Sequence, residues 1–575
     1  MKYAFLFFFF LLTCNSQAQN LEWLVSGGGA KSDKGTTIVI DEQGNSYITG
    51  YYNEEANFGP LNTGFSFTQS KEVFVAKLDP DGNFIWQTHG LNYFDDRGLG
   101  LAIDELGNTY VTGTCWGGLE WPPLSVYCPT SYTDQIFVTK IDNSGNVVWM
   151  KNAGNHSLDG NWYNDDHGLD IVADQNGSVF VTGFISNTHA IALPANFDNI
   201  AINIPPYDSL AFVGKLDTDG NWQWIETFEG IVEQRDNAIS MDDEGNVYVT
   251  GGFKNTKQFG STNLTSNGGS DIYVIKYDTD GNFIWAQSAG GLLDDRGNGL
   301  VDGHDGFMYV TGEFRDISTF GIYTLDNAGG PKGRDIFVAK MSKNGVWKWC
   351  RRAGSKKGSD RGNYIASNAI GNLFVTGQFS SEADFGNFTI DSSGDSVQVF
   401  TAAIDTAGIW RWVIQGGGPS YDRGQGIAVD DDCNAWVVGY FDSSMDLMGT
   451  SIAPNQGKDI FAFKLTDICF GYDDEPNPDP VPEGCTIDVG NIFTPNGDNI
   501  NDFLTFSNNC NTNFYAVVIN RWGNIVYEST DAFAQWDGNS PMGIPVKEGV
   551  YFYRVVVTLE SAEDQEYSGF IQLER

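Results

Sequence analysis

Basic residues, histidines and long apolar runs are all scarce in this chain of 575 residues. Its 33 lysines and arginines stand against 74 aspartates and glutamates, which gives a formal net charge of −41. A surface of this sign repels phosphate backbones, so no nucleic-acid partner is expected. After the N-terminal apolar stretch no run approaches the roughly 18 apolar residues that a membrane span needs, so no transmembrane segment is expected either.

Short catalytic and metal-binding motifs are also missing. The chain has no C-x-x-C, no H-E-x-x-H, no G-x-S-x-G and no P-loop, and its five histidines share no pattern. Acidic pairs are too frequent in its turns for spacing to select two glycosidase carboxylates. We therefore predict no enzyme, no catalytic residue and no cofactor. Calcium stays a candidate ion for acidic turns such as Asp79–Gly82 and for the group Asp498, Asn501 and Asp502, although turn chemistry explains the former.

The first 18 residues have the pattern of a secretory signal peptide. Lys2 supplies a positive charge, Ala4–Leu12 form an apolar core, and Ser16-Gln17-Ala18 is a small-x-small cleavage site. Export would place the remaining cysteines in an oxidising compartment, where disulfides persist.

Two disulfides are expected from cysteine positions. Cys115 and Cys128 flank a short insertion, and Cys485 and Cys510 both lie in the C-terminal region. The pairing of the other three cysteines stays open; a bond between cysteines 350 and 433, in different repeats, would leave cysteine 469 over.

A hairpin unit recurs through most of the chain. At Asp271–Trp285 an apolar run, an Asp-Gly-Asn turn and a second run that ends on tryptophan follow one another, which is a strong hairpin signal. The unit recurs at Glu72–Trp86, Gln135–Trp149, Leu210–Trp224, Asp335–Trp349 and Val397–Trp412. Its first half recurs alone at Asp459–Leu465, and a matching second half stands at the other end of the chain, in Leu21–Ser26.

A second landmark, Tyr47–Gly50, gives the period. Six further copies follow, and their closing glycines are 61 to 70 residues apart. A period above about 50 with four strands per unit indicates propeller blades. We predict an all-β fold in which residues 19–467 form a seven-bladed β-propeller, closed by pairing of Leu21–Ser26 with Asp459–Leu465, because closure removes an open sheet edge.

Several recurrent residues have structural interpretations. The tryptophan that ends each hairpin is expected to pack between neighbouring blades, where a large aromatic side chain is well buried. The lysine inside the third strand, as at Lys276, is expected to pair with an aspartate of the same or the adjacent blade.

A basic residue precedes each presumed inner strand, and these residues would ring one mouth of the central channel. They are Lys34, Arg97, His167, Arg235, Arg296, Arg361 and Arg423. The ring has two interpretations: an anion site, or a structural belt of Asp–Arg pairs between blades. We favour the structural belt, because aspartates recur beside most of the basic residues.

Four aromatic residues in lengthened loops, which would suit a ligand if exposed, are the candidate ligand-binding residues. Trp116 and Trp121 lie in a lengthened loop of the second repeat, and Trp162 and Tyr163 in the third. Loops on a rigid scaffold often carry function, and aromatic rings suit sugars or protein partners. A local mini-core held by Cys115–Cys128 is the equal alternative.

The C-terminal part differs in composition. Residues 468–484 are rich in proline and acid and are predicted to be an extended linker. Residues 485–575 contain about six short strands that suggest an immunoglobulin-like β-sandwich. The strands are expected at Ile487–Phe493, Phe503–Phe506, Tyr515–Asn520, Ile525–Glu528, Gly549–Thr558 and Tyr567–Leu573.

The repeats and their Asp-x-x-Gly-Asn turns, such as Asp41–Asn45 and Asp242–Asn246, resemble the SBBP family of seven-bladed bacterial propeller repeats. This resemblance implies a fold and no catalytic residues. The segments Phe493–Asp498, Asn520–Gly523 and Trp536–Gly538 resemble the gliding-motility-associated C-terminal domain, the type B sorting domain of the type IX secretion system. The matching motif residues are Asn496, Gly497, Asp498, Asn501, Asp502, Arg521, Trp522 and Gly523.

Together these features predict a protein that the type IX secretion machinery, acting on the C-terminal domain, exports to the cell surface or the medium. Its expected role is adhesion or recognition of a glycan or protein ligand, without catalysis. The alternatives are a polysaccharide-active enzyme with a site at the channel mouth, which a carboxylate cluster with shifted pKa values would favour, and a purely structural surface component.

Overall fold

The computed structural model describes residues 19–64, 70–126, 134–155, 165–229, 237–392, 396–470, 487–489, 492–495, 503–508, 513–520, 525–529, 535–540, 545–558 and 564–573. Several predicted features lie outside the described residues: the signal peptide, Cys128, Trp162, Tyr163, Arg235, Cys485, Cys510, Asn496, Gly497, Asp498, Asn501, Asp502, Arg521, Trp522 and Gly523. The chain divides into two compact units, one ending at Phe470 and one beginning at Gly471.

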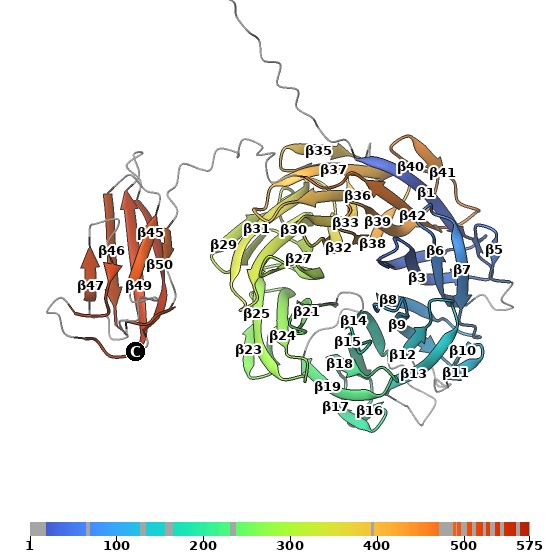
Figure 1. The fold of residues 1–575 in the computed structure, drawn as a ribbon, viewed down its shortest axis with the longest axis horizontal. Helices are drawn as coiled ribbons and strands as arrows, with labels where there is room; N and C mark the ends of the chain where they lie inside the picture. The colour runs from blue at the N-terminus through green and yellow to red at the C-terminus, as the bar shows by residue number, and fades with distance from the viewer. Residues whose placement is uncertain are drawn as a thin grey trace, which may run out of the picture. The chain divides into compact units, whose positions relative to one another are not determined.

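Antiparallel sheets build the first unit, and Figure 1 shows them arranged around a common axis. The first sheet contains β2 (Lys34–Ile40), β3 (Ser46–Asn53), β6 (Lys71–Leu78) and β7 (Phe84–His89). The next contains β8 (Arg97–Ile103), β9 (Thr109–Trp116), β12 (Asp134–Ile141) and β13 (Val147–Asn155). Then come β14 (His167–Ala173), β15 (Val179–Asn187), β18 (Asp208–Leu216) and β19 (Trp222–Glu229).

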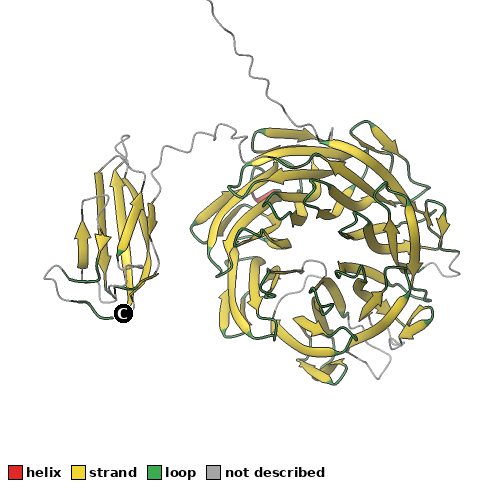
Figure 2. Cartoon of the chain, in the orientation of Figure 1, coloured by secondary structure: helices red, strands yellow, loops and turns green. Residues whose placement is uncertain are grey.

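The same four-strand order continues along the chain. It is repeated by β20 (Ala238–Met241), β21 (Val247–Phe253), β24 (Asp271–Tyr277) and β25 (Phe283–Gly291), and by β26 (Arg296–Asp302), β27 (Phe307–Phe314), β30 (Asp335–Ser342) and β31 (Trp347–Ser355). It is repeated again by β32 (Arg361–Ser367), β33 (Leu373–Ser380), β36 (Val397–Ile404) and β37 (Trp410–Gly417). One short 3-10 helix, η1 (Gly330–Lys332), is the single helix among the described residues (Figure 2).

The last sheet joins the two ends of the first unit. It contains β38 (Arg423–Val429), β39 (Ala435–Phe441), β42 (Asp459–Thr466) and, as its outer strand, β1 (Asn20–Gly28). β1 runs antiparallel to β42, with Leu21 opposite Leu465 and Ser26 opposite Phe461. The first strand of each sheet contacts the first strand of the next, and the series runs from β2 through β38 back to β2.

The segment after each second strand forms an extra hairpin, in addition to the four strands predicted for each repeat. In most sheets it pairs with the outer strand of the preceding sheet; β28, for example, pairs with β25. The hairpins are β4 (Asn57–Phe58) with β5 (Leu61–Asn62), β10 (Leu119–Trp121) with β11 (Leu124–Val126), β16 (Leu193–Phe197) with β17 (Ile200–Ile204), β22 (Thr256–Phe259) with β23 (Thr262–Thr265), β28 (Ile317–Phe320) with β29 (Tyr323–Asp326), β34 (Glu382–Phe385) with β35 (Phe388–Asp391) and β40 (Met445–Leu447) with β41 (Thr450–Ile452).

The recurrent tryptophans pack across the boundaries between sheets, as predicted. The indole of Trp224 donates to the carbonyl of Thr279 at 3.3 Å and lies against Gly281 in the next hairpin turn. A Cβ at Gly281, whose φ is +85°, would stand 2.7 Å from that indole, so the turn needs glycine both for its φ and for the close approach. The same indole–carbonyl bond is made by Trp23, Trp86, Trp149, Trp285, Trp349 and Trp412.

Most lysines of the third strands find acidic partners in their own sheet, while Lys215 donates to the carbonyl of Thr279. Lys276 lies 3.5 Å from Asp242, and its ammonium also lies 4.9 Å from the ring centre of Tyr248. Lys340 lies 2.8 Å from Asp305. The structural pairing predicted for this position is confirmed at both residues.

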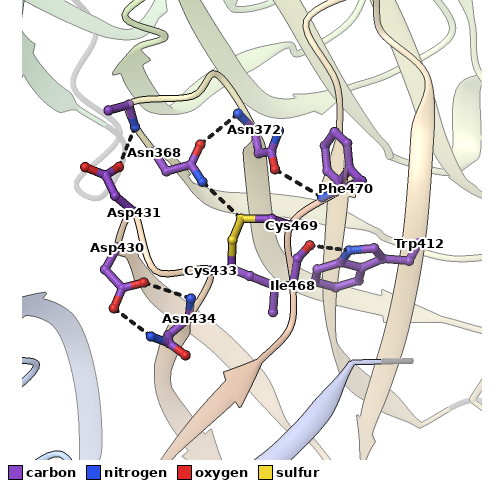
Figure 3. The surroundings of a disulfide bond; sticks show 11 residues. Asn368, Asn372, Trp412, Asp430, Asp431, Cys433, Asn434, Ile468, Cys469 and Phe470 are labelled. Carbon is purple, nitrogen blue, oxygen red and sulfur yellow. Dashed lines mark hydrogen bonds between the residues drawn. A yellow bond between two sulfur atoms is a disulfide. The ribbon is translucent and has the colours of Figure 1, made fainter. Parts of the chain in front are cut away.

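The disulfide between Cys433 and Cys469 fastens the end of the first unit (Figure 3). Ile468 is fully buried beside it and accepts the Trp412 indole N–H at 3.0 Å. The predicted linker therefore began too early, because the chain stays packed on the sheets as far as Phe470. Cys350 is buried and is not in a disulfide, so a bond between Cys350 and Cys433 is wrong.

The second unit consists of two sheets that share one core. β43 (Ile487–Val489), β45 (Leu504–Asn508) and β48 (Gln535–Trp536) form one sheet, and β44 (Ile492–Phe493), β50 (Asp564–Leu573), β49 (Gly549–Thr558), β46 (Asn513–Ile519) and β47 (Ile525–Ser529) form the other. Trp536 and Leu504 from the first sheet pack with Val518 and Val555 from the second, which is the arrangement expected of a sandwich. Among the described residues of either unit, no helix has the length and hydrophobicity needed to cross a membrane.

Candidate binding cavity on the axis of the sheets

A cavity of about 290 Å³ lies where the first strands of the sheets meet. Strands β2, β8, β14, β20, β26, β32 and β38 all contribute to its wall. Five members of the predicted basic ring line it: Lys34, Arg97, His167, Arg361 and Arg423. The sequence reading thus located these side chains at one shared site, while Arg296 does not line the cavity and Arg235 lies outside the described residues.

Acidic partners hold part of this ring in place. Glu313 on β27 is 1% exposed and lies 2.5 Å from Arg361, 2.8 Å from Arg334 and 3.6 Å from Arg296. A buried carboxylate is stable as an anion only with close cationic partners, and here three guanidinium groups share one. Two further pairs are Arg97 with Asp95 at 3.1 Å and His167 with Asp134 at 3.3 Å.

The aspartates that directly precede the basic residues have a different role from the predicted Asp–Arg belt. Asp295 is fully buried, and its two oxygens accept backbone N–H groups of Gly291, in the preceding sheet, and Arg315. Asp33, Asp166, Asp360 and Asp422 accept two backbone N–H groups in the same way. The aspartates recur because they join successive sheets through the main chain.

Burial raises the pKa of these carboxyl groups, even though the backbone hydrogen bonds act in the opposite direction. The pKa of Asp33 rises from its ordinary value of 3.8 to about 7, that of Asp295 to about 7 and that of Asp166 to about 8. Shifted pKa values are therefore a repeated property of the scaffold and do not single out a catalytic centre.

One carboxylate, that of Asp170 on β14, belongs to the described lining of the cavity. Burial raises the pKa of Asp170 to about 7. The hydrogen bonds that it accepts from the backbone N–H groups of Ile239 and Ile171 lower the pKa, but by less than burial raises it. Its charge, followed by burial, raises the pKa of Tyr364 on β32, which also lines the cavity. Tyr364 occupies the same register position in β32, whereas the residues there in the remaining first strands are small: Thr37, Gly100, Ala238, Gly299 and Gly426.

Amides and tyrosines complete the wall. Asn298 donates its amide N–H to the carbonyl of Gly362 at 3.0 Å, and this bond fixes the orientation of its side chain. Tyr51, Gln378 and Tyr440 stand directly opposite Lys34, Arg361 and Arg423 in the strand register. These three residues were not predicted from the sequence. Each directly follows the closing glycine of a copy of the Tyr47–Gly50 motif, and this position lies opposite a basic residue of the neighbouring strand.

The aromatic loop candidates do not form an exposed platform as far as the structure describes them. Trp121 is fully buried, and its indole N–H donates to Thr88 Oγ1 at 2.8 Å. The prediction of Trp121 as a ligand-binding residue is therefore wrong, because its ring packs in the core with Leu119. Trp116 stacks on Phe94 with ring centres 4.6 Å apart. Trp162 and Tyr163 lie outside the described residues. Cys115 is disulfide-bonded.

Two groups of side chains have metal-ligand spacing, Asp134 with Asp165 and His167, and Asp243 with Asp302 and His304. The calcium-like turns, in contrast, use their carboxylates internally. Asp79 accepts the backbone N–H groups of Asp81 and Asn83 at 3.0 and 2.8 Å, so turn chemistry accounts for its position.

The fold and the two units define a β-propeller protein with an added β domain. Two segments then match named families: residues 26–58 match the beta-propeller repeat SBBP, and residues 487–573 match the CHU_C type IX secretion signal domain. The chain thus carries a propeller repeat and a C-terminal type IX secretion signal domain, which implies export to the cell surface or beyond.

Curated relatives are distant and longer. An uncharacterized WD repeat-containing protein, L264, of Acanthamoeba polyphaga mimivirus is 24% identical over 516 residues, which cover 73% of this chain and 36% of that protein. The regulatory protein FlaEY of Caulobacter vibrioides is 24% identical over 206 residues, covering 33% of this chain and 21% of its own length. The chain therefore spans about a third and a fifth of the length of these relatives.

Solved structures resemble the chain only distantly. A puromycin hydrolase mutant complexed with PGG is 9% identical with a TM-score of 0.39, covering 80% of this chain and 57% of its own. PorZ of Porphyromonas gingivalis, described as an essential surface component of the type IX secretion system, is 12% identical with a TM-score of 0.22, covering 95% and 82%. Likenesses this low carry no functional argument.

Proposed function

We propose that this protein is a seven-bladed propeller, closed into a ring by its N-terminal strand, that is exported through its C-terminal sorting domain and recognises an extracellular ligand without catalysis. The order of contacts from β2 to β38 and back supports seven blades, and the pairing of β1 with β42 supports the closure. The closure covers β42, which would otherwise be an open sheet edge able to join another chain.

The observation that carries the recognition role is the composition of the axial cavity. Its described lining includes five basic side chains but one carboxylate, Asp170. Glycoside hydrolysis commonly needs two carboxyl groups that face each other across the bond to be cleaved. A cavity with cations, amides and tyrosines but without such a pair is better suited to hold a ligand than to hydrolyse it.

The test combines binding with turnover. The purified full chain is applied to glycan and extracellular-protein arrays, and every ligand that binds is then incubated with the chain and assayed for new reducing ends or new peptide termini. We expect binding without cleavage. Cleavage of a bound glycan would establish the enzyme alternative, and an absence of binding to both arrays would favour a structural surface component.

Export is tested separately. Deletion of residues 485–575 should leave the chain inside the outer membrane, because the sorting domain is the part that the secretion machinery engages. A full-length chain with Lys348→Gln, an exposed residue on β31, serves as a control whose export should not change. Efficient export of the truncated chain would refute this part of the proposal.

A further inference from the structure

The β38 side of the cavity carries a cation, Arg423, that forms no ion pair with the described carboxylates. None of them lies within 4.0 Å of Arg423, and its Nε is buried without a hydrogen-bond partner. Its guanidinium lies 6.0 Å from the ring centre of Tyr440, and the ammonium of Lys34 lies 4.5 Å from the same ring. Two positive groups beside one ring favour an anion between them, since a partly dehydrated guanidinium gains most from a charged acceptor.

The surroundings add positive charge. Glu313 is shared by three guanidinium groups, so Arg361 at the cavity wall is incompletely neutralised. Asp95 is likewise shared between Arg97 and Lys71, at 3.1 and 2.5 Å. The cavity therefore has the opposite sign to a chain whose net charge is −41. A concave site lined by one sign of charge concentrates the field and selects ligands of the other sign.

Two acceptor atoms favour a ligand that also carries hydrogen-bond donors. The side-chain oxygens Oδ1 of Asn298 and Oε1 of Gln378 are buried and have no hydrogen-bond partner, and Gln378 is only 4% exposed. Both residues line the cavity. An oxyanion cannot satisfy an acceptor, whereas a hydroxyl group can. An unsatisfied buried oxygen is costly, so a ligand that supplies O–H groups here gains affinity.

From these observations we propose that the cavity binds an acidic sugar, with Arg423 and Lys34 holding its oxyanion and Asn298 and Gln378 accepting its hydroxyl groups. The shared chemistry is an oxyanion on a polyhydroxylated ring, as in a uronate, a sugar sulfate or a sugar phosphate. This inference rests on the proposed recognition function, since it names the ligand class of the same cavity. An acidic peptide offers the oxyanion but few hydroxyl groups, so the sugar is the better fit.

The experiment is calorimetric titration of the purified full chain with glucuronate, glucose 6-sulfate and glucose 6-phosphate, and in parallel with glucose, inorganic sulfate and an acidic peptide. Glucose lacks the oxyanion and sulfate lacks the hydroxyl groups, so each should bind at least tenfold more weakly than the best sugar acid. The strongest of the three sugar acids identifies the kind of oxyanion. Equal binding of glucose, or tighter binding of the peptide, would overturn the proposal.

Matched variants locate the site. Arg423→Gln should weaken binding of the best sugar acid at least tenfold, and Gln378→Leu should weaken it while leaving the response to inorganic sulfate unchanged. Lys348→Gln removes the same charge from an exposed position on β31 and should bind like the parent chain. Thermal unfolding confirms that each variant is folded, and Lys34→Gln replaces Arg423→Gln if the latter is not.

The outcome separates this inference from the proposed function. If array ligands bind and the affinity for sugar acids is the same in the parent and in Arg423→Gln, the chain is still a recognition protein and the cavity assignment is wrong. If no array ligand binds but the sugar acids do, and Arg423→Gln abolishes that binding, the cavity assignment stands on its own.

Discussion

We expect the buried carboxyl groups to make the stability of the first unit fall as the pH rises. Asp459, at the start of β42, is 1% exposed; its Oδ2 accepts the N–H of Asn455 at 2.9 Å, and its Oδ1 has no partner. Oδ1 of Asp459 and Oδ2 of Asp33 both lie beside Gly28, 2.7 and 2.8 Å from the point that a Cβ would take. Two carboxyl groups this close cannot both ionise without a large repulsion.

The residue equivalent to Asp459 in the sheet of β12 supports a protonated carboxyl group at Asp459. In that sheet Gln135 replaces the aspartate, and its amide N–H points at Asp166 with a separation of 3.4 Å. A neutral donor thus occupies the place that Asp459 takes beside Asp33. Asp459 can supply such a donor only in its protonated form.

The magnitude follows from the pKa of Asp459, which burial raises from 3.8 to about 6. Because one pKa unit corresponds to about 1.4 kcal/mol, ionising this group costs about 3 kcal/mol more in the folded chain than in the unfolded chain. The folded chain holds the proton more tightly, so this contribution is complete below pH 3.8 and is lost as the pH rises through about 6.

Asp459→Asn tests this reasoning, because asparagine has the shape of the protonated acid and does not titrate. We expect it to change the midpoint of thermal unfolding little near pH 4 and to stabilise the first unit by about 3 kcal/mol, relative to that change, near pH 8. Scanning calorimetry at both pH values measures the effect, with Asp432→Asn, at an exposed position, as the control. An equal loss of stability at both pH values would show that Asp459 is ionised throughout and would refute the argument.

Three further predictions concern the scaffold. Gly281→Ala should lower the unfolding midpoint by an amount equivalent to at least 1 kcal/mol, because a Cβ there would overlap the Trp224 indole and the φ is positive; Ala at an exposed strand position should not. Replacing Cys433 and Cys469 together by alanine should cost about 4 kcal/mol of stability in the loop-entropy model. Calorimetry of the variant and the parent chain, under oxidising and then reducing conditions, measures this difference, which should disappear on reduction. Glu313→Gln should cost about 3 kcal/mol, because three guanidinium groups lose their shared anion, and added salt should recover part of the loss.

Hairpins and repeat positions were predictable because their causes are local. The tryptophan of each hairpin and the glycine of the next turn hold equivalent positions in successive repeats, so their contact recurs with the repeat. The extra hairpins were missed because the strand that β28 pairs with, β25, belongs to the preceding repeat, and no local pattern marks a partner across that boundary. The Cys433–Cys469 bond was missed for the same reason, since it depends on how far the chain stays packed after β42.

The cavity shows where repetition stops being informative. A residue that recurs in every sheet needs a partner that also recurs, and the tryptophans and aspartates all find one in the scaffold. One register position of the first strands is different: it holds small residues in most sheets, but Asp170 in one and Tyr364 in another. Structural repetition does not require a charge or a large ring at that position. Departures from the repeat that line one cavity are therefore better guides to the ligand than the residues that define the repeat, and Asp170 and Tyr364 are the first two positions to vary when the bound sugar acid is known.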